Sequence, residues 1–271
     1  MTEPAEHVFG SDAQKAVLRK GRALFDVVHG DGRFSSHGRA VGLVGTDSGP
    51  MSLIARLAEL QGATHYACVG KDLVQQVLAK APATGLQATH YARWEIKAED
   101  LHHATQATVD IQLPDGLTLQ QMTPETPQEL VASFAHMSLG CGVLPAWLSA
   151  HMGLTLPART LMAVTDEGRV VSSAYASGYI TDGSDRAQRE CFWGMLATDP
   201  DWRGQRLSVL LGGLLLQQMH TDFGFTDFYT GVEPGNAPSE AVCARLGLRK
   251  SGRSIVTFAD ARHVPGGRMT K

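Results

Sequence analysis

Clustered cysteine is the first thing that the sequence lacks. Its 271 residues include four cysteines, and no two of them form a C-x-x-C pair. Four scattered cysteines without such a pair are typical of neither a disulfide framework nor a zinc site, and the sequence predicts no bound metal. The scattered thiols are expected to be reduced, as is typical of a cytoplasmic protein.

A large excess of charge of one sign is also missing. The formal net charge is -3 at pH 7, which provides no basic surface for nucleic acid. The longest uncharged, leucine-rich run, residues 207–219, is shorter than the roughly 20 residues that span a bilayer. Residues 1–6 are acidic and lack the apolar core of a signal peptide. We therefore expect no nucleic-acid partner, no membrane association and a cytoplasmic location.

Apolar residues recur with helical and strand spacings along the whole chain. In the first part we expect loops at 30–38 and 97–115, helices at 11–29, 51–61 and 71–81, and strands at 40–44, 64–69 and 88–96. In the second part we expect strands at 117–122, 160–165, 170–179, 189–198, 227–232 and 254–259, and helices at 126–138 (capped by Thr126), 145–152, 205–221 and 236–246. The segment Leu113–Gly116 is typical of a domain boundary, which predicts an N-terminal α/β domain at 1–112 and a second domain at 113–271. The tail from Val264 is expected to fray.

The most informative stretch runs from Glu190 to Ser208. Its first part is a short apolar run that suits a buried strand, and Asp199-Pro200-Asp201 ends that run. A basic, glycine-containing loop follows and leads into a leucine-rich helix. A strand, a loop and a helix start in this order leave several main-chain N–H groups unpaired, and the positive end of the helix dipole adds to them. The stretch therefore predicts an anion-binding site.

The loop Arg203-Gly204-Gln205-Arg206-Leu207-Ser208 resembles the acyl-CoA pyrophosphate loop of the GCN5-related N-acetyltransferase (GNAT) superfamily, Gln/Arg-x-x-Gly-x-Gly/Ala. Arg203 keeps the first position, and Arg206 and Ser208 replace the two small residues. The donors in such a loop are main-chain N–H groups, so the replacements leave the chemistry in place. Arg206 also brings positive charge toward a phosphate.

A second segment, residues 236–248, resembles the Asn-x-x-Ala-x-x-x-Tyr-x-x-x-Gly-Phe helix of the same superfamily. Asn236 matches, whereas Ser239 replaces the alanine and Cys243 replaces the tyrosine. Two motifs in the right order and spacing carry the resemblance over roughly residues 115–262. It implies a mixed-sheet α/β (α+β) fold, the GNAT acyl-CoA N-acyltransferase fold, preceded by a smaller α/β segment.

The resemblance implies acetyl-CoA as acyl-donor co-substrate. The family separates its two central strands at a bulge, for which Gly194 is a suitable residue. A main-chain N–H near Leu196 would then stabilise the oxyanion. The residues implied in binding the donor are Leu196, Ala197 and Thr198 for the pantetheine arm, the loop Arg203–Ser208 for the pyrophosphate, and Asn236 and Ser239, with Asn236 also capping its helix.

Several side chains are candidates for proton transfer. Glu190 begins the central strand and is the best-placed base, because burial would raise its pKa toward the working range; the alternative is a solvent-facing glutamate. Tyr229 is a second candidate, and His136 and His151 are lesser ones. Cys243 is either the proton donor to the CoA sulfur or a small packing residue, and we favour packing.

The acceptor pocket is expected to include residues 139–151, with Trp147, and the aromatic residues Tyr175, Tyr179, Phe192 and Trp193. Aromatic and apolar walls favour a modest-sized acceptor that is not strongly anionic.

A constant offset of 162 residues aligns two parts of the chain. It pairs Gly62, Thr64, Tyr66, Gly85 and Leu86 with Gly224, Thr226, Phe228, Gly247 and Leu248. Either the N-terminal part is a degenerate GNAT-like half, or the matches are chance.

Taken together, the sequence predicts an N-acetyltransferase that moves acetyl from acetyl-CoA to the amine of a small molecule by direct attack in a ternary complex. The alternative is a non-catalytic acyl-CoA sensor or interaction module with the same fold. A further variant would use a longer acyl chain or an aminoacyl donor. The expected partner is the amine acceptor, with a homodimer as an option.

Overall fold

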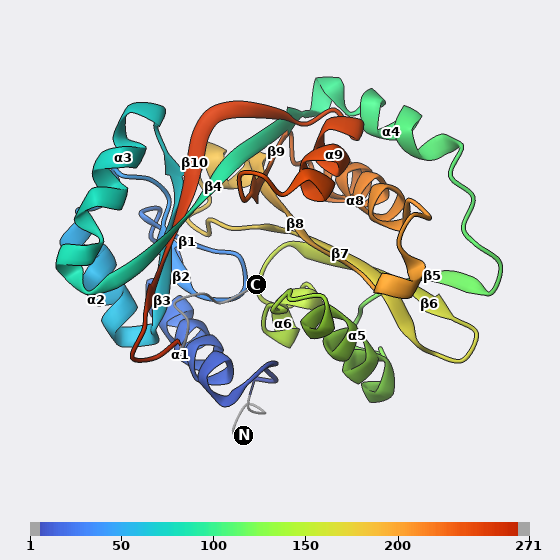
Figure 1. Ribbon diagram of the computed structural model, residues 1–271, viewed down its shortest axis with the longest axis horizontal. Helices are drawn as coiled ribbons and strands as arrows, with labels where there is room; N and C mark the ends of the chain where they lie inside the picture. Colours follow the sequence, from blue (N-terminus) through green and yellow to red (C-terminus); the bar gives the residue numbers. More distant parts are fainter. Residues whose placement is uncertain (1–5, 265–271) are drawn as a thin grey trace.

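A single mixed sheet forms the centre of the molecule (Figure 1). The structure is a computed structural model that describes residues 6–264. The expectation that the N-terminus is not a signal peptide falls largely on residues 1–5, and the expectation that the tail frays falls largely on residues 265–271, so both lie outside the described residues. The strand order is β1-β2-β3-β10-β4-β9-β8-β7-β6-β5. The strands are β1 Phe34–Ser36, β2 Val41–Leu43, β3 Ala63–Val69, β4 Leu86–Lys97, β5 Leu117–Gln121, β6 Ala158–Thr165, β7 Val170–Gly178, β8 Glu190–Thr198, β9 Asp227–Val232 and β10 Arg249–Asp260.

Helices cover both faces of this sheet (Figure 1). They are α1 Asp12–Val28, α2 Met51–Gln61, α3 Lys71–Lys80, α4 His102–Val109, α5 Gln128–Gly140, α6 Leu148–His151, α7 Asp185–Arg189, α8 Leu207–Phe223 and α9 Ala237–Arg245. None of the helices in residues 6–264 is long and apolar enough to cross a membrane.

Most predicted elements are confirmed, and the departures have local causes. Residues 97–115 are not irregular throughout, because they include α4, whose weak amphipathic pattern hides it in the sequence. Strand β1 lies within residues 30–38, which were predicted to be a loop, and helix α7 takes up Arg189, the first residue of the predicted strand 189–198. Helix α5 begins after Pro127, and the Thr126 hydroxyl accepts a hydrogen bond from the Thr123 N–H (2.9 Å) instead of capping the helix.

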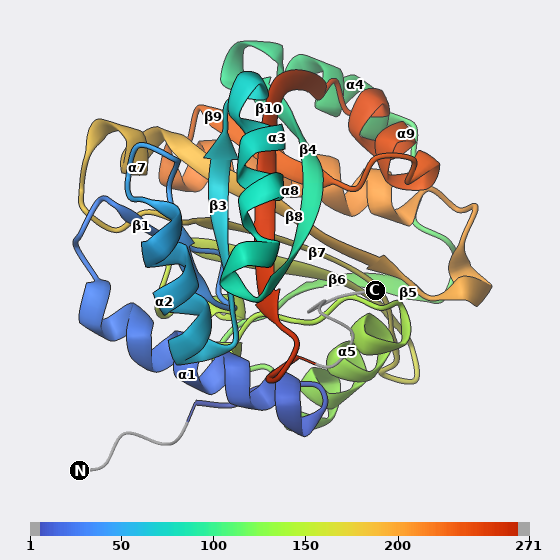
Figure 2. The same ribbon diagram turned by 60° about the vertical axis from the view of Figure 1, so that its left-hand side comes forward.

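The two parts of the chain exchange strands. Strand β4 lies between β10 and β9, and β10 lies between β3 and β4, with all three pairings antiparallel. On either side of this exchange, β2 pairs with β3 and β8 pairs with β9 in parallel. Along β2-β3-β10-β4-β9-β8, the sequence of parallel and antiparallel pairings is therefore the same when it is read from either end. Figure 2 shows α2 and α3 in front of β3, β10 and β4.

The predicted repeat is confirmed by this arrangement. Shifted by the offset, β3 falls on β9, α3 on α9 and β4 on β10. The helices α2 and α8 both end at a left-handed glycine, Gly62 with φ 97° and Gly224 with φ 76°. Gly85 and Gly247 share the left-handed conformation as well. The chain therefore has two related halves joined by one sheet, and the proposed division at residues 112 and 113 remains a prediction.

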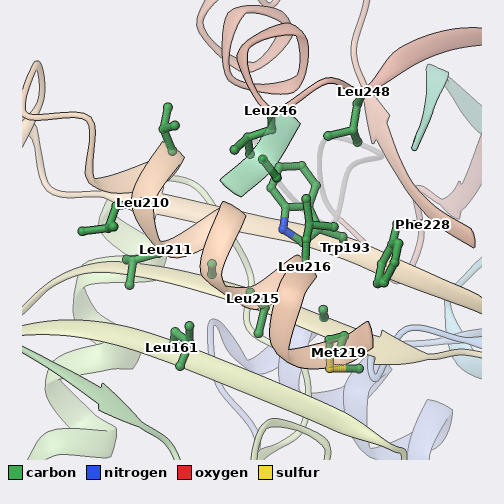
Figure 3. Packing of buried hydrophobic residues seen from close by; sticks show 14 of the residues in the cluster. Leu161, Trp193, Leu210, Leu211, Leu215, Leu216, Met219, Phe228, Leu246 and Leu248 are labelled. Carbon is green, nitrogen blue, oxygen red and sulfur yellow. The ribbon is translucent and has the colours of Figure 1, made fainter. Parts of the chain in front are cut away.

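Helix α8 packs closely on the second half of the sheet. Strand alternation sends Leu161 into the core under α8 and Met162 into the core under α5 on the other face. The two helical glycines allow this approach: a Cβ at Gly212 would lie 2.6 Å from the Trp193 ring, and one at Gly213 would lie 2.5 Å from the Thr108 side chain of α4. Figure 3 shows the Trp193 ring beside Leu216. The glycine pair thus lets α8 lie close against Trp193 of β8 and against α4.

Candidate functional site

The two parallel strands at the centre of the second half separate along their length. Strand β8 pairs with β9 only from Glu190 to Phe192. Beyond Phe192, β8 continues to Thr198, while β9 continues along β4. The expected opening between the central strands is therefore present, and it leaves the β9-facing edge of β8 without a partner strand.

A bulge lies in β8 where the opening begins. Met195 and Leu196 together face a single residue of β7, and Met195 has a left-handed φ of 51°. The bulge thus follows Gly194 directly, in agreement with the expectation for this strand. Bulges re-aim the main chain next to active sites, and the positive φ of a non-glycine residue indicates local strain.

The loop from Arg203 to Ser208 leads from β8 to α8 and presents main-chain donors. Within the described chain, the N–H groups of residues 204–208 have no protein acceptor. The loop is exposed from Arg203 to Arg206, and it stands at the positive end of a 17-residue helix. Arg206 has φ 59°, the left-handed conformation that favours glycine. This geometry gives a physical reason for the glycine that is usual at this position in GNAT loops.

Hydrogen bonds between hydroxyl groups link the loop to β8 and β7. The Thr198 hydroxyl lies 2.8 Å from the Ser208 hydroxyl and 2.8 Å from the Ser172 hydroxyl of β7. On the other side of the opening, the Asn236 side chain accepts a hydrogen bond from the Ser239 N–H (3.3 Å) and caps α9, as predicted.

The opening continues into a cavity of about 820 Å³, which we call the cleft. Every residue predicted to bind the donor lines it except Gln205. Its mouth also carries Arg245, which the motif analysis missed; with Arg203 and Arg206 it places three cations around the loop. Glu233 is the one carboxylate among the described lining residues. A cleft of this volume and charge suits an anionic ligand of substantial size.

Glu190 is not a free base. It lies among Arg186 (Nε–Oε1 2.9 Å), Arg93 (3.4 Å) and the hydroxyl of Tyr179, to which it is hydrogen-bonded. Burial raises its pKa, but the Tyr179 hydrogen bond and the two guanidinium groups outweigh burial and hold the pKa below its usual value. The expected upward shift is therefore wrong, and Glu190 does not line the cleft.

Tyr229 and Cys243 are both buried. The Tyr229 hydroxyl lies 2.6 Å from His37 Nε2, the Arg93 guanidinium lies 3.7 Å from its ring centre, and burial together with Tyr179 raises its pKa. Cys243 lines the cleft, and burial together with Glu240 raises its pKa to about 12. A thiol that holds its proton so strongly is a poor acid, which favours the packing interpretation.

The predicted acceptor residues divide into two groups. Phe192, Trp193 and residues 141–143 line the cleft, whereas Trp147, Tyr175 and Tyr179 are core residues outside it. His136 is exposed. His151 bonds Thr160 and the Ala146 N–H, and burial lowers its pKa to about 3.

The inner wall of the cleft comes from the N-terminal half, and sequence reasoning missed it. We call it the N-terminal wall; its residues are His37, Arg39, Thr64, His65, Thr89 and Tyr91. Burial lowers the pKa of His65 to about 4, and burial with the neighbouring His65 and Arg39 lowers that of His37. Both imidazoles are therefore neutral at pH 7.

A possible set of metal ligands lies apart from the cleft. Asp100, His102 and His103 place their ligand atoms within 4.8 Å of one another near the start of α4. None of the three lines the cleft.

The fold was then compared with known proteins. No family model and no curated protein matches the sequence. A tandem GNAT protein from the clavulanic acid biosynthesis pathway aligns with a TM-score of 0.53 and 18% identity over 77% of this chain and 69% of that chain. A functionally unknown conserved protein from Staphylococcus epidermidis aligns with a TM-score of 0.50 and 9% identity, over 87% and 97% of the two chains. A Drosophila protein gives 0.50 and 15%, over 76% and 66%. At these identities the likeness shows the fold alone, and the predicted GNAT fold with two halves is confirmed.

Proposed function

We propose that this protein is an acetyl-CoA-dependent N-acetyltransferase that acts on the amine of a small molecule. The observation that carries the proposal is the unpaired edge of β8, which runs from the bulge at Met195 to a loop whose N–H groups at residues 204–208 lack protein acceptors. Unpaired main-chain donors at a helix N-terminus bind phosphate. An unpaired strand edge can pair with the amide groups of a pantetheine arm.

The donor would be held by the residues of the second half. The loop and the arginines at the mouth would hold the diphosphate, and the edge from Leu196 to Thr198 would hold the arm. When bound, acetyl-CoA supplies an acetyl group activated as a thioester. The amine nitrogen forms a bond to the acetyl carbon, the carbon–sulfur bond breaks, and the sulfur leaves and takes up a proton. The proton that the amine loses would pass to solvent, because burial lowers the pKa of His37 and His65 and makes both imidazoles weak bases.

Donor binding is tested by thermal shift with CoA and acetyl-CoA. At a hundredfold excess over Kd, a ligand stabilises the folded state by about 2.7 kcal/mol, which for a chain of this length raises Tm by on the order of 5 °C. Ser208→Asp places a carboxylate among the loop donors, where an aspartate also suits the helix. We expect this variant to remain folded and to lose the shift.

Gln128→Asp is the matched control, because it adds the same charge to the exposed first turn of α5, away from the cleft. An equal shift in wild-type protein and Ser208→Asp would contradict the proposed loop. Release of CoA thiol over a panel of amines then separates an enzyme from a sensor: a protein that binds acetyl-CoA and releases no thiol with any amine is the sensor. The replacement of the usual tyrosine by Cys243 favours that second candidate.

A further inference from the structure

Arg39 is a cation in the cleft that has no hydrogen-bond or ion-pair partner among residues 6–264. It lies in the turn between β1 and β2, and its Nε atom is fully buried with no hydrogen-bond partner. No hydrogen bond or ion pair joins its guanidinium to any group in residues 6–264. The two terminal nitrogens are not among the fully buried atoms. Arg39 is a lining residue of the cleft, so its incompletely buried guanidinium lies at the boundary of that cavity.

The surroundings of Arg39 do not neutralise its charge. The N-terminal wall contains no carboxylate, and Glu233 lies on the other side of the opening in the loop that precedes Asn236. Burial lowers the pKa of Arg39 to about 10, and the neighbouring groups that oppose this shift are the hydroxyls of Tyr91 and Tyr175. A guanidinium is charged at pH 7 even so, and an unpaired buried charge is costly. An anion from outside the chain would remove that cost.

The turn that carries Arg39 is held in place from both sides. The Trp147 N–H donates a hydrogen bond to the Gly38 carbonyl (2.8 Å), and the Ser36 hydroxyl donates one to the Ala40 carbonyl (3.2 Å). Gly38 has φ 81°, and a Cβ there would lie 2.7 Å from Ala146. Gly21 of α1 allows the Arg39 carbonyl to approach, because a Cβ at Gly21 would lie 2.4 Å from it. The guanidinium therefore starts from a fixed backbone, as a recognition residue requires.

The same turn lies next to the part of β8 where the opening begins, from Phe192 to the bulge at Met195. The His37 ring centre is 4.4 Å from that of Phe192, the last residue of β8 that pairs with β9. Phe192 and the bulge residue Met195 both pack against the core cluster that contains Val41, Ala146 and Tyr175. An acceptor amine directed at the bulge would thus bring its other groups close to Arg39.

We propose that Arg39 binds a carboxylate of the acceptor, so that the amine which is acetylated belongs to an amino acid or a similar amino carboxylate. This inference rests on the proposed function. A guanidinium binds a carboxylate through two parallel hydrogen bonds. A single cation on the N-terminal wall balances one negative charge, whereas a phosphate brings about -1.5 to -2. The N-terminal half therefore selects the acceptor, and the second half binds the donor.

The test compares matched amines that differ by the carboxylate, such as L-phenylalanine with phenethylamine and glycine with methylamine. Acetyl-CoA-dependent thiol release gives kcat/KM for each. A hydrogen-bonded charge pair contributes about 10- to 100-fold, so the carboxylated member should be preferred by that factor. Arg39→Gln should raise KM for the carboxylated amine, so that the ratio of the two kcat/KM values comes close to one. Arg39→Lys should restore part of the preference. Arg33→Gln is the matched control, since Arg33 is exposed and pairs with Asp31 outside the cleft.

Binding of product analogues gives a readout that does not need turnover. N-acetyl-L-phenylalanine and N-phenethylacetamide are titrated calorimetrically with and without CoA, and only the first should bind, with an affinity that Arg39→Gln lowers by the same factor. If CoA does not raise Tm but N-acetyl-L-phenylalanine still binds, the result would count against the proposed function alone. An acceptor ratio of one in wild-type protein, a ratio that persists in Arg39→Gln, or no carboxylate binding at millimolar concentration would overturn the inference. If the effect of Arg39→Gln differs between succinyl-CoA and acetyl-CoA as donors, Arg39 contacts the donor, and this result would overturn the inference as well.

Arg39→Met tests whether the residue is merely structural. Removing an uncompensated buried charge should leave the urea midpoint of the ligand-free protein unchanged or raised. A large fall in that midpoint would show that Arg39 serves the fold and would overturn the inference.

Discussion

Substitution of Glu190 separates a structural ion pair from a catalytic base. Its carboxylate has three partners, from α7, β4 and the end of β7: Arg186, Arg93 and the hydroxyl of Tyr179. Removing one member of a buried pair costs about 3–5 kcal/mol. Glu190→Gln should cost less, about 2–3 kcal/mol, because the amide still accepts from Tyr179 and charged hydrogen bonds are worth about 1.5–3 kcal/mol each. Arg93 also keeps Glu95 at 2.6 Å.

The assay is urea unfolding at several pH values, together with kcat of the folded enzyme. The folded state lowers the pKa of Glu190 from 4.5, so its contribution is fully present above about pH 4.5 and is lost as pH falls through the lower folded pKa. The difference between wild type and Glu190→Gln should therefore shrink below that pH, while kcat at pH 7 changes by no more than about fivefold, since no transition-state contact is removed. Asp185→Asn is the control: its side chain is 87% exposed and 3.6 Å from Arg189, so it should cost less than about 0.5 kcal/mol. A hundredfold loss of kcat with an unchanged urea midpoint would refute this reasoning and restore Glu190 as the base.

Two further substitutions probe the cleft. Cys243→Ala should keep most of the acetyltransferase activity and lower the free energy of unfolding by about 1 kcal/mol, the usual cost of a small cavity; a thousandfold fall in kcat with an intact fold would instead make the thiol the proton donor. Arg206→Gly should change the free energy of unfolding by no more than about 1 kcal/mol, because relief of the left-handed strain offsets the added flexibility, and it should weaken CoA binding about tenfold through the lost charged contact. Arg206→Val, which cannot relieve that strain, should be the less stable of the two in urea; the opposite order would show that φ at this position does not limit the loop.

Local sequence signals predicted local structure well. The asparagine cap of α9, which was predicted, depends on residues three positions apart. The insertion of β4 between β9 and β10 depends instead on partners 130 or more residues away, and nothing in the composition of β4 specifies them. The offset of 162 residues was the one sequence feature that carried information about this long-range arrangement.

The same distinction explains what was found and missed in the site. The anion loop is a continuous segment, so its pattern can be read directly. The pKa of Glu190 is lowered by the Tyr179 hydrogen bond, by Arg186 and by Arg93, and Arg93 lies 97 residues away in sequence. Burial alone gave the wrong sign for this pKa. Arg39 gives no local signal at all, because an arginine in a glycine-containing loop is ordinarily a solvated side chain. Its role depends on a fold that buries its Nε atom without a partner.

The two halves differ where the cleft would form, and this difference assigns them different tasks. In the second half, β8 extends six residues beyond its last pair with β9, which leaves a free edge for a ligand. In the first half, β2 ends at Leu43, the residue that pairs with β3, and residues 44–50 connect it to α2. That half therefore has no free edge at the equivalent place. Its β1–β2 turn instead reaches the cleft of the other half and contributes His37 and Arg39 to the wall. Under the proposed function the first half completes the acceptor side of the cleft, and loss of acceptor selectivity without loss of CoA binding is the signature expected when that turn is altered.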